Sequence, residues 1–193
     1  MFSPIRNKFI DLSALSVVTF GSLGCGSVKD AIDNLLSFSI ERSIPEQQID
    51  GQVVPCQVAR ALNIELPILE DMTISKEEDF PEQNTEVNLI REAYLSVLNL
   101  SLTEGSAAED WDFLDSITFS VAANNLETVE VAKLDPVPDD LTALALSPLG
   151  VNLANYLKSE GGFSFEVTAT GCPPSADVLF NGEIKIDVSA SPL

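Results

Sequence analysis

The sequence predicts a mainly β domain, an antiparallel β-sandwich with one or two short helices. Several stretches alternate apolar and polar residues with a period of two, which is the pattern of a strand with one buried face. Turn residues separate about seven such stretches, as in sandwich domains. At 193 residues and 45% hydrophobic content, the chain can bury the core of one such domain. A small antiparallel β-barrel is the alternative arrangement of the same strands.

A β-hairpin is predicted in the middle of the chain. Apolar residues at every second position of 117–121 indicate one strand, and Val129–Val131 supplies its partner. Asn124-Asn125 lies between them and tolerates the positive φ of a tight turn. Pro136 then ends the second strand.

Two further strands are predicted near the C-terminus. Residues 163–169 alternate strictly, and residues 178–190 keep one parity through Gly182, which indicates a long, bent strand. Gly171-Cys172-Pro173-Pro174 provides the turn between them. The C-terminal half is therefore expected to be an antiparallel meander.

The stretch 93–103 contains two alternations that meet. Leu95 and Val97 share one parity, whereas Leu98 and Leu100 share the other. A strand whose buried face changes in this way requires a β-bulge, which we expect near Val97.

The other elements are predicted from shorter patterns. They are a helix over 28–36, a strand over 38–44, a polar turn over 47–52, a short helix from Pro55 to Leu62, a strand over 66–74, a solvated loop over 75–87, a strand at 144–146 and a helix over 151–158 that Gly161-Gly162 ends.

The composition excludes several function classes. The chain carries 10 Lys plus Arg against 30 Asp plus Glu, a formal net charge of −20, so it is not expected to bind nucleic acid. It contains no histidine, which removes the most frequent general base and transition-metal ligand. The strong acidity is consistent with a solvated exterior or with capture of Ca²⁺.

Residues 1–25 have the order of an export signal. Arg6 and Lys8 precede an apolar run at 12–20, and small residues then lead to Cys25. The run is too short to span a bilayer of roughly 30 Å. The alternative is an N-terminal helix with a buried cysteine.

This segment resembles the signal peptide of bacterial lipoproteins, in which the cysteine after the cleavage site is acylated. Gly24 fits the lipobox of that family, whereas Leu23 and Asp11 depart from its usual pattern. The resemblance covers these 25 residues only. It implies a signal peptide over 1–24, a lipidated Cys25 in a short tether over 25–27, and a single domain over 28–193.

The cysteine count agrees with export. If Cys25 carries lipid, Cys56 and Cys172 remain as a pair in a compartment where disulfides persist. We expect them to be bonded, with a stabilisation of roughly 4 kcal/mol in the chain-entropy model. Two separate buried thiols are the alternative.

A dense group of acids surrounds the one tryptophan. Hard cations such as Ca²⁺ prefer several oxygen ligands, so Glu109, Asp110, Asp112 and Asp115 are the candidate metal ligands. Trp111 is the candidate platform for a ligand. The spacing lacks the glycine and the terminal glutamate of an EF-hand, so a solvated loop around a packed tryptophan is the alternative.

These observations predict a non-enzymatic cell-envelope lipoprotein. It would be anchored to the membrane through Cys25, at the outer membrane or cell surface rather than the inner membrane, and would present an immunoglobulin-like or similar sandwich to a protein partner. Its organisation is similar to that of bacterial envelope lipoproteins. The alternative is a small carbohydrate- or calcium-binding module, and a carboxylate-based hydrolase is a third hypothesis, although no acid pair stands out.

Overall fold

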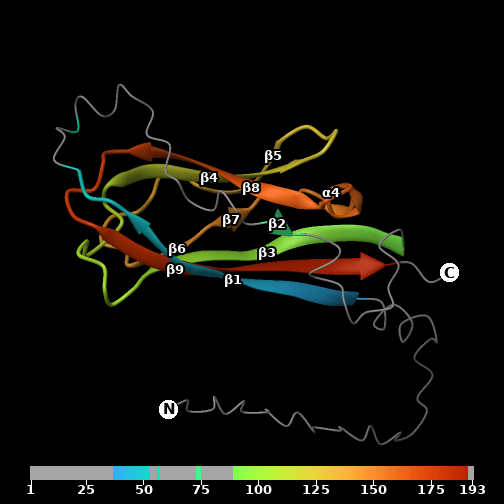
Figure 1. Cartoon of the computed structure of the whole chain (residues 1–193), viewed down its shortest axis with the longest axis horizontal. Helices are drawn as coiled ribbons and strands as arrows, with labels where there is room; N and C mark the ends of the chain where they lie inside the picture. Colours follow the sequence, from blue (N-terminus) through green and yellow to red (C-terminus); the bar gives the residue numbers. More distant parts are fainter. Residues whose placement is uncertain (1–36, 53–55, 57–72, 75–88, 191–193) are drawn as a thin grey trace, which may run out of the picture.

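The chain folds into an antiparallel β-sandwich, seen in the computed structural model as two layers of strands (Figure 1). The structure describes residues 37–52, 56, 73–74 and 89–190. In this part of the chain one sheet has four strands, in the order β1-β9-β3-β6, and the other has five, in the order β2-β8-β4-β5-β7. The strands form two sheets and not one closed barrel, which confirms the predicted sandwich.

The elements have the following bounds: β1 Ser37–Ile49, β2 Thr73–Ile74, β3 Ile90–Leu102, β4 Leu114–Ala123, β5 Val129–Leu134, β6 Ala143–Ala145, β7 Ser147–Pro148, α4 Ala154–Lys158, β8 Phe163–Gly171 and β9 Val178–Ala190. The predicted signal peptide, Cys25, the helix expected over 28–36, most of the helix over 55–62, most of the strand over 66–74 and the loop over 75–87 lie outside the described residues.

Strand β9 is the centre of the four-stranded sheet. It pairs with β1 on one side and with β3 on the other, over almost its whole length. Gly182 lies directly opposite Ile44 of β1 and Leu100 of β3. The predicted long strand through Gly182 is therefore confirmed. The predicted meander of 163–169 and 178–190 is wrong, because β8 lies in the other sheet, where it pairs with β4, and the chain crosses between the sheets after Gly171.

Strand β3 contains the bulge that its sequence predicts. The register with β9 shifts between Leu95 and Val97, so that Ser96 has no direct partner on β9. Leu95 and Leu98 are both buried as a result, while Val97 turns toward the outer face. A change of parity along a strand is thus a reliable local signal for a bulge.

Strand β1 is longer than predicted. The polar residues from Gln47 were expected to form a turn, but β1 continues to Ile49 after a register shift between Ile44 and Gln47. The bulge at this shift restores Ile49 to the buried face. Tertiary pairing with β9 therefore outweighs the low strand propensity of this polar segment.

The predicted central hairpin is present as β4 and β5. Asn125 has a φ of 61°, the left-handed conformation expected in its turn, and β4 pairs with β8 on its other side. Helix α4 begins later than predicted, at Ala154, and glycines with positive φ follow it at Gly161 and Gly162.

The predicted strand at 144–146 is present as β6, one residue earlier, and a second short strand, β7, follows it in the other sheet. β6 pairs with β3 of one sheet, and β7 pairs with β5 of the other. Leu144 and Leu146 are buried beneath this crossing. The segment therefore closes one side of the sandwich.

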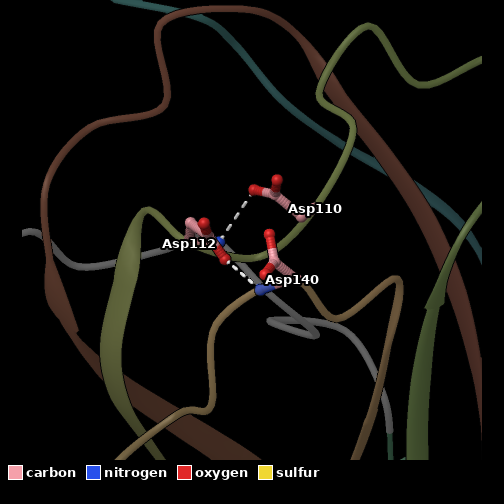
Figure 2. Close-up of side chains that lie close together, drawn as sticks. All are labelled: Asp110, Asp112 and Asp140. Atoms are coloured by element: carbon pink, nitrogen blue, oxygen red, sulfur yellow. Dashed lines mark hydrogen bonds between the residues drawn. The ribbon is translucent and has the colours of Figure 1, made fainter.

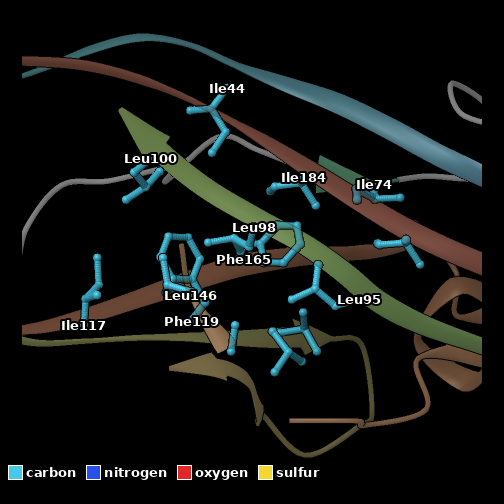
Figure 3. Close-up of a cluster of buried hydrophobic side chains, with 14 of the residues drawn as sticks. Ile44, Ile74, Leu95, Leu98, Leu100, Ile117, Phe119, Leu146, Phe165 and Ile184 are labelled. Atoms are coloured by element: carbon cyan, nitrogen blue, oxygen red, sulfur yellow. The ribbon is translucent and has the colours of Figure 1, made fainter. Parts of the chain in front are cut away.

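The core lies between the two sheets and consists of apolar side chains (Figure 3). Ile44, Leu98 and Ile184 from the four-stranded sheet face Phe119 and Phe165 from the five-stranded sheet. No polar or charged residue is buried in the described part of the chain. The sandwich therefore owes its stability mainly to apolar burial and to its ladder hydrogen bonds.

Candidate functional site

Trp111 fixes the loop that joins β3 to β4. Its side chain is fully buried, with its ring centroid 5.5 Å from that of Phe180 in an edge-to-face arrangement. Its backbone N–H donates to the Leu141 carbonyl at 3.0 Å, and its indole N–H donates to the Thr142 carbonyl at 3.3 Å. Trp111 therefore holds the 103–113 loop against the segment that precedes β6.

This packing brings the side chains of three aspartates close together (Figure 2). Asp110 and Asp112 flank Trp111 in the sequence. Asp140 comes directly before Leu141 and Thr142, whose carbonyls accept hydrogen bonds from Trp111. One carboxylate oxygen from each lies within 4.8 Å of the others. We call Asp110, Asp112 and Asp140 the aspartate cluster.

Backbone hydrogen bonds orient two of these carboxylates. The Asp112 N–H donates to Asp110 Oδ1 at 3.1 Å, and the Asp140 N–H donates to Asp112 Oδ1 at 2.7 Å. Asp140 has a φ of 60°, in the left-handed region that aspartate tolerates better than most residues. The cluster is thus a defined loop structure and not three independent side chains.

The spacing of the aspartate cluster is compatible with a hard cation. Ligand oxygens lie about 2.3–2.6 Å from Ca²⁺, so two ligands of one ion are at most about 5 Å apart. Asp112 and Asp140 are exposed and Asp110 is half-buried, so an ion could keep several water ligands.

The cluster differs from the predicted set of metal ligands. Asp110 and Asp112 belong to it, but Glu109 and Asp115 do not. Asp140, which sequence analysis did not place with them, is the third member. The density of acidic residues around Trp111 correctly indicated the loop that holds Asp110 and Asp112. Asp140 lies far along the chain and reaches this loop because Trp111 hydrogen-bonds the residues that follow Asp140.

Trp111 does not form a ligand platform in this structure. A platform must expose one face of its ring, but the exposed fraction of Trp111 is 0%. The prediction of a platform at Trp111 is therefore wrong, because the large apolar ring gains more by filling the core than by remaining at the surface.

Cys56 and Cys172 lie at disulfide distance, with their Cα atoms 4.9 Å apart. Cys172 follows β8, and its N–H donates to the Phe113 carbonyl at 2.7 Å. The pair joins positions 116 residues apart in the sequence. It is the pairing that the cysteine count predicts.

Two lysines on the sheet surfaces form ion pairs. Lys185 contacts Glu41 at 3.1 Å, and Lys133 contacts Asp135 at 2.9 Å. The hydrogen bond from each lysine to its carboxylate, followed by their charge attraction, raises the pKa of both lysines above the ordinary value of 10.5. Such exposed pairs contribute little to stability.

The fold and the site define this protein as an acidic β-sandwich domain with one cysteine pair. No protein-family model matches the chain, and no curated protein matches it either. Among the residues that the structure describes, no helix has the length and apolar character needed to cross a membrane.

Proposed function

We propose that this chain is a non-enzymatic lipoprotein of the bacterial cell envelope, which presents its β-sandwich to a protein partner. The observation that carries the proposal is the pair Cys56–Cys172, because disulfides persist in oxidising compartments and are rare in the cytosol. It supports export independently of the N-terminal resemblance.

The N-terminal segment supplies the rest of the argument for anchoring. Its basic residues, apolar run and Cys25 match the order of a lipoprotein signal. Once the third cysteine is lipidated, the remaining two form the observed pair, so all three cysteines have a role. The anchor would hold the sandwich at the outer membrane or cell surface.

The non-enzymatic assignment is supported by the side chains available for chemistry. The sequence has no histidine, and the buried residues of the described part are all apolar. General bases and nucleophiles usually depend on partly desolvated polar groups in a cleft. A surface for binding is the simpler use of this sandwich.

Intact mass spectrometry of protein recovered from the native host's envelope fraction tests this proposal. We expect a chain that begins at Cys25 with added acyl mass, and a gain of two protons on reduction. A Cys25→Ser variant is the matched control, which should lose the acyl mass and leave the membrane fraction. An unprocessed chain with three free thiols would refute the proposal.

A second candidate function is a calcium-binding module, which the aspartate cluster specifically favours. If Ca²⁺ binds the folded state only, it should raise stability by about 2.7 kcal/mol when present at 100 times its Kd. Thermal unfolding with Ca²⁺ from micromolar to millimolar concentrations measures this effect. Asp112→Asn should abolish it, whereas Glu109→Gln, outside the cluster, should not; no shift in Tm at millimolar Ca²⁺ would remove this candidate.

A further inference from the structure

The outer face of the four-stranded sheet contains a depression of about 330 Å³ at the end where β1 begins and β9 ends. Two rows of directly paired residues from β1, β9 and β3 form its floor. The first row is Ser39, Asp187 and Tyr94, and the second is Ser37, Ser189 and Glu92. We call these six residues the Tyr94 depression.

Tyr94 supplies an exposed aromatic ring in this depression. It is one of three large hydrophobic side chains that are exposed in the described residues, with an exposed fraction of 37%. Its direct neighbour across the strand is Asp187, and side chains so paired have Cβ atoms about 4.5–5.5 Å apart. The two side chains therefore start from neighbouring positions on the same face of the sheet.

The backbone that carries Tyr94 is held firmly. The Ala93 N–H donates to Asn152 Oδ1 at 3.1 Å, and the Ala93 carbonyl accepts the Leu153 N–H at 2.7 Å. Ala93 itself is fully buried. Tyr94 is thus presented from a rigid sheet, which limits the entropy lost when a ligand binds.

The charged residues that line the depression are acidic. Its described lining contains two carboxylates, Asp187 and Glu92, and no base. Ser39 donates a hydrogen bond to Asp187 Oδ1 at 2.7 Å and so helps to orient that carboxylate. The adjacent Lys185 lies outside the lining; it is bonded to Glu41 at 3.1 Å and is attracted more weakly to Asp187.

We propose that the Tyr94 depression binds a lysine or arginine side chain of a partner protein. An ammonium or guanidinium group over the tyrosine ring gains a cation–π interaction, and the neighbouring carboxylates pair with its charge. The net charge of −20 also attracts a basic partner over longer distances. This inference rests on the proposed function, since it names the surface and the chemistry of that protein partner.

The test uses the ¹⁵N-labelled full-length chain, titrated with an acetylated and amidated tetralysine peptide at about 150 mM salt, where long-range attraction is screened. We expect the amide shifts to concentrate at 37–39, 92–94 and 187–189. Tyr94→Ala removes the ring without changing the charge, and should weaken binding about two- to fivefold. Tyr94→Phe keeps the ring and should bind as the wild type does.

Asp139→Asn is the matched control for charge, because Asp139 is exposed and lies in the loop beside the aspartate cluster. It should leave the shifts at the Tyr94 depression unchanged, whereas Asp187→Asn should weaken them. Shifts that spread evenly over the surface, that concentrate at the aspartate cluster, or that persist unchanged in Tyr94→Ala would overturn the inference.

The outcome is separable from that of the proposed function. If the chain is lipidated and disulfide-bonded but does not bind tetralysine, the inferred binding at the Tyr94 depression is refuted. The proposal of an envelope lipoprotein is then unaffected. If tetralysine binds at Tyr94 but the chain is never processed, the inferred binding site is supported and the lipoprotein proposal is refuted.

Discussion

Gly182 allows the most direct test of how the four-stranded sheet is packed. It lies in the middle of β9, opposite Ile44 on one side and Leu100 on the other. A Cβ atom built on Gly182 would be 2.8 Å from Ile44 Cδ1 and 2.9 Å from Leu100 Cδ2, and would overlap the Asn99 carbonyl oxygen. The two apolar side chains occupy the space that another residue would need.

We expect Gly182→Ala to lower the free energy of unfolding by roughly 2 kcal/mol. Overpacking in a well-packed core costs about 1–3 kcal/mol, and the overlap with a backbone oxygen of β3 places this site at the upper end. Alanine also reduces the entropy of the unfolded chain, which offsets about 0.4–1 kcal/mol of that cost. The steric term is larger because backbone in a paired central strand cannot move aside as a flexible side chain can.

Urea unfolding followed by the fluorescence of Trp111 measures this change. Trp111 is the only tryptophan and is fully buried, so its emission reports the loss of the core. With a slope of about 2 kcal/mol per molar urea, the midpoint should fall by roughly 1 M.

Gly105→Ala is the matched control. Its added Cβ would meet Leu179 Cδ1 at 3.0 Å, the end of a flexible side chain, so its midpoint should change little. If Gly182→Ala proves as stable as the wild type, the inferred packing of Ile44 and Leu100 over Gly182 is incorrect.

Three further predictions concern the cysteine pair, a bridging asparagine and a surface ion pair. Replacing both Cys56 and Cys172 by alanine should lower the free energy of unfolding by roughly 4–5 kcal/mol, because the pair joins positions 116 residues apart. Equal urea midpoints for this variant and the oxidised wild type would contradict the pairing. Asn152→Ala should cost about 1–3 kcal/mol in thermal unfolding, because the part-buried Ala93 backbone N–H loses the Asn152 Oδ1 that accepts its hydrogen bond. Asn152→Asp keeps this acceptor and loses only the Nδ2 that donates to the Arg91 carbonyl, so it should cost less. The raised pKa of Lys185, caused first by its hydrogen bond to Glu41, means that this pair stabilises the fold below the ordinary lysine pKa of 10.5. It ceases to do so as the pH rises through the higher pKa of the folded state. The stability difference between wild type and Glu41→Gln should therefore be constant from about pH 7 to 9 and decline as the pH rises beyond the ordinary lysine pKa of 10.5. A difference that varied between pH 7 and 9 would exclude Lys185 as its source.

Local periodicity was sufficient to predict the sandwich and several of its details. Side chains alternate across a strand, so the apolar parity of β8 and β9 identifies their buried faces without knowledge of their partners. The same rule located the bulge near Val97, because a strand cannot change its buried face without an extra residue.

The polar end of β1 and the division of 143–148 between two sheets could not be predicted in this way. Gln47 joins a strand only because β9 offers a ladder of hydrogen-bonding groups beside it. Ala143–Ala145 and Ser147–Pro148 pair with different sheets because they cross the open side of the sandwich. Both outcomes depend on neighbours that are distant in the sequence.

The candidate site also combines features that the sequence predicts with features that only the fold determines. The sequence by itself determined that acids are dense around Trp111, and that Cys56 and Cys172 are the two cysteines outside the export-like segment. Only the tertiary structure decided that Trp111 is buried and that Asp140 joins Asp110 and Asp112. The reason is physical: composition and period are properties of neighbouring residues, whereas the meeting of Asp112 and Asp140 follows from how the whole chain packs one aromatic ring.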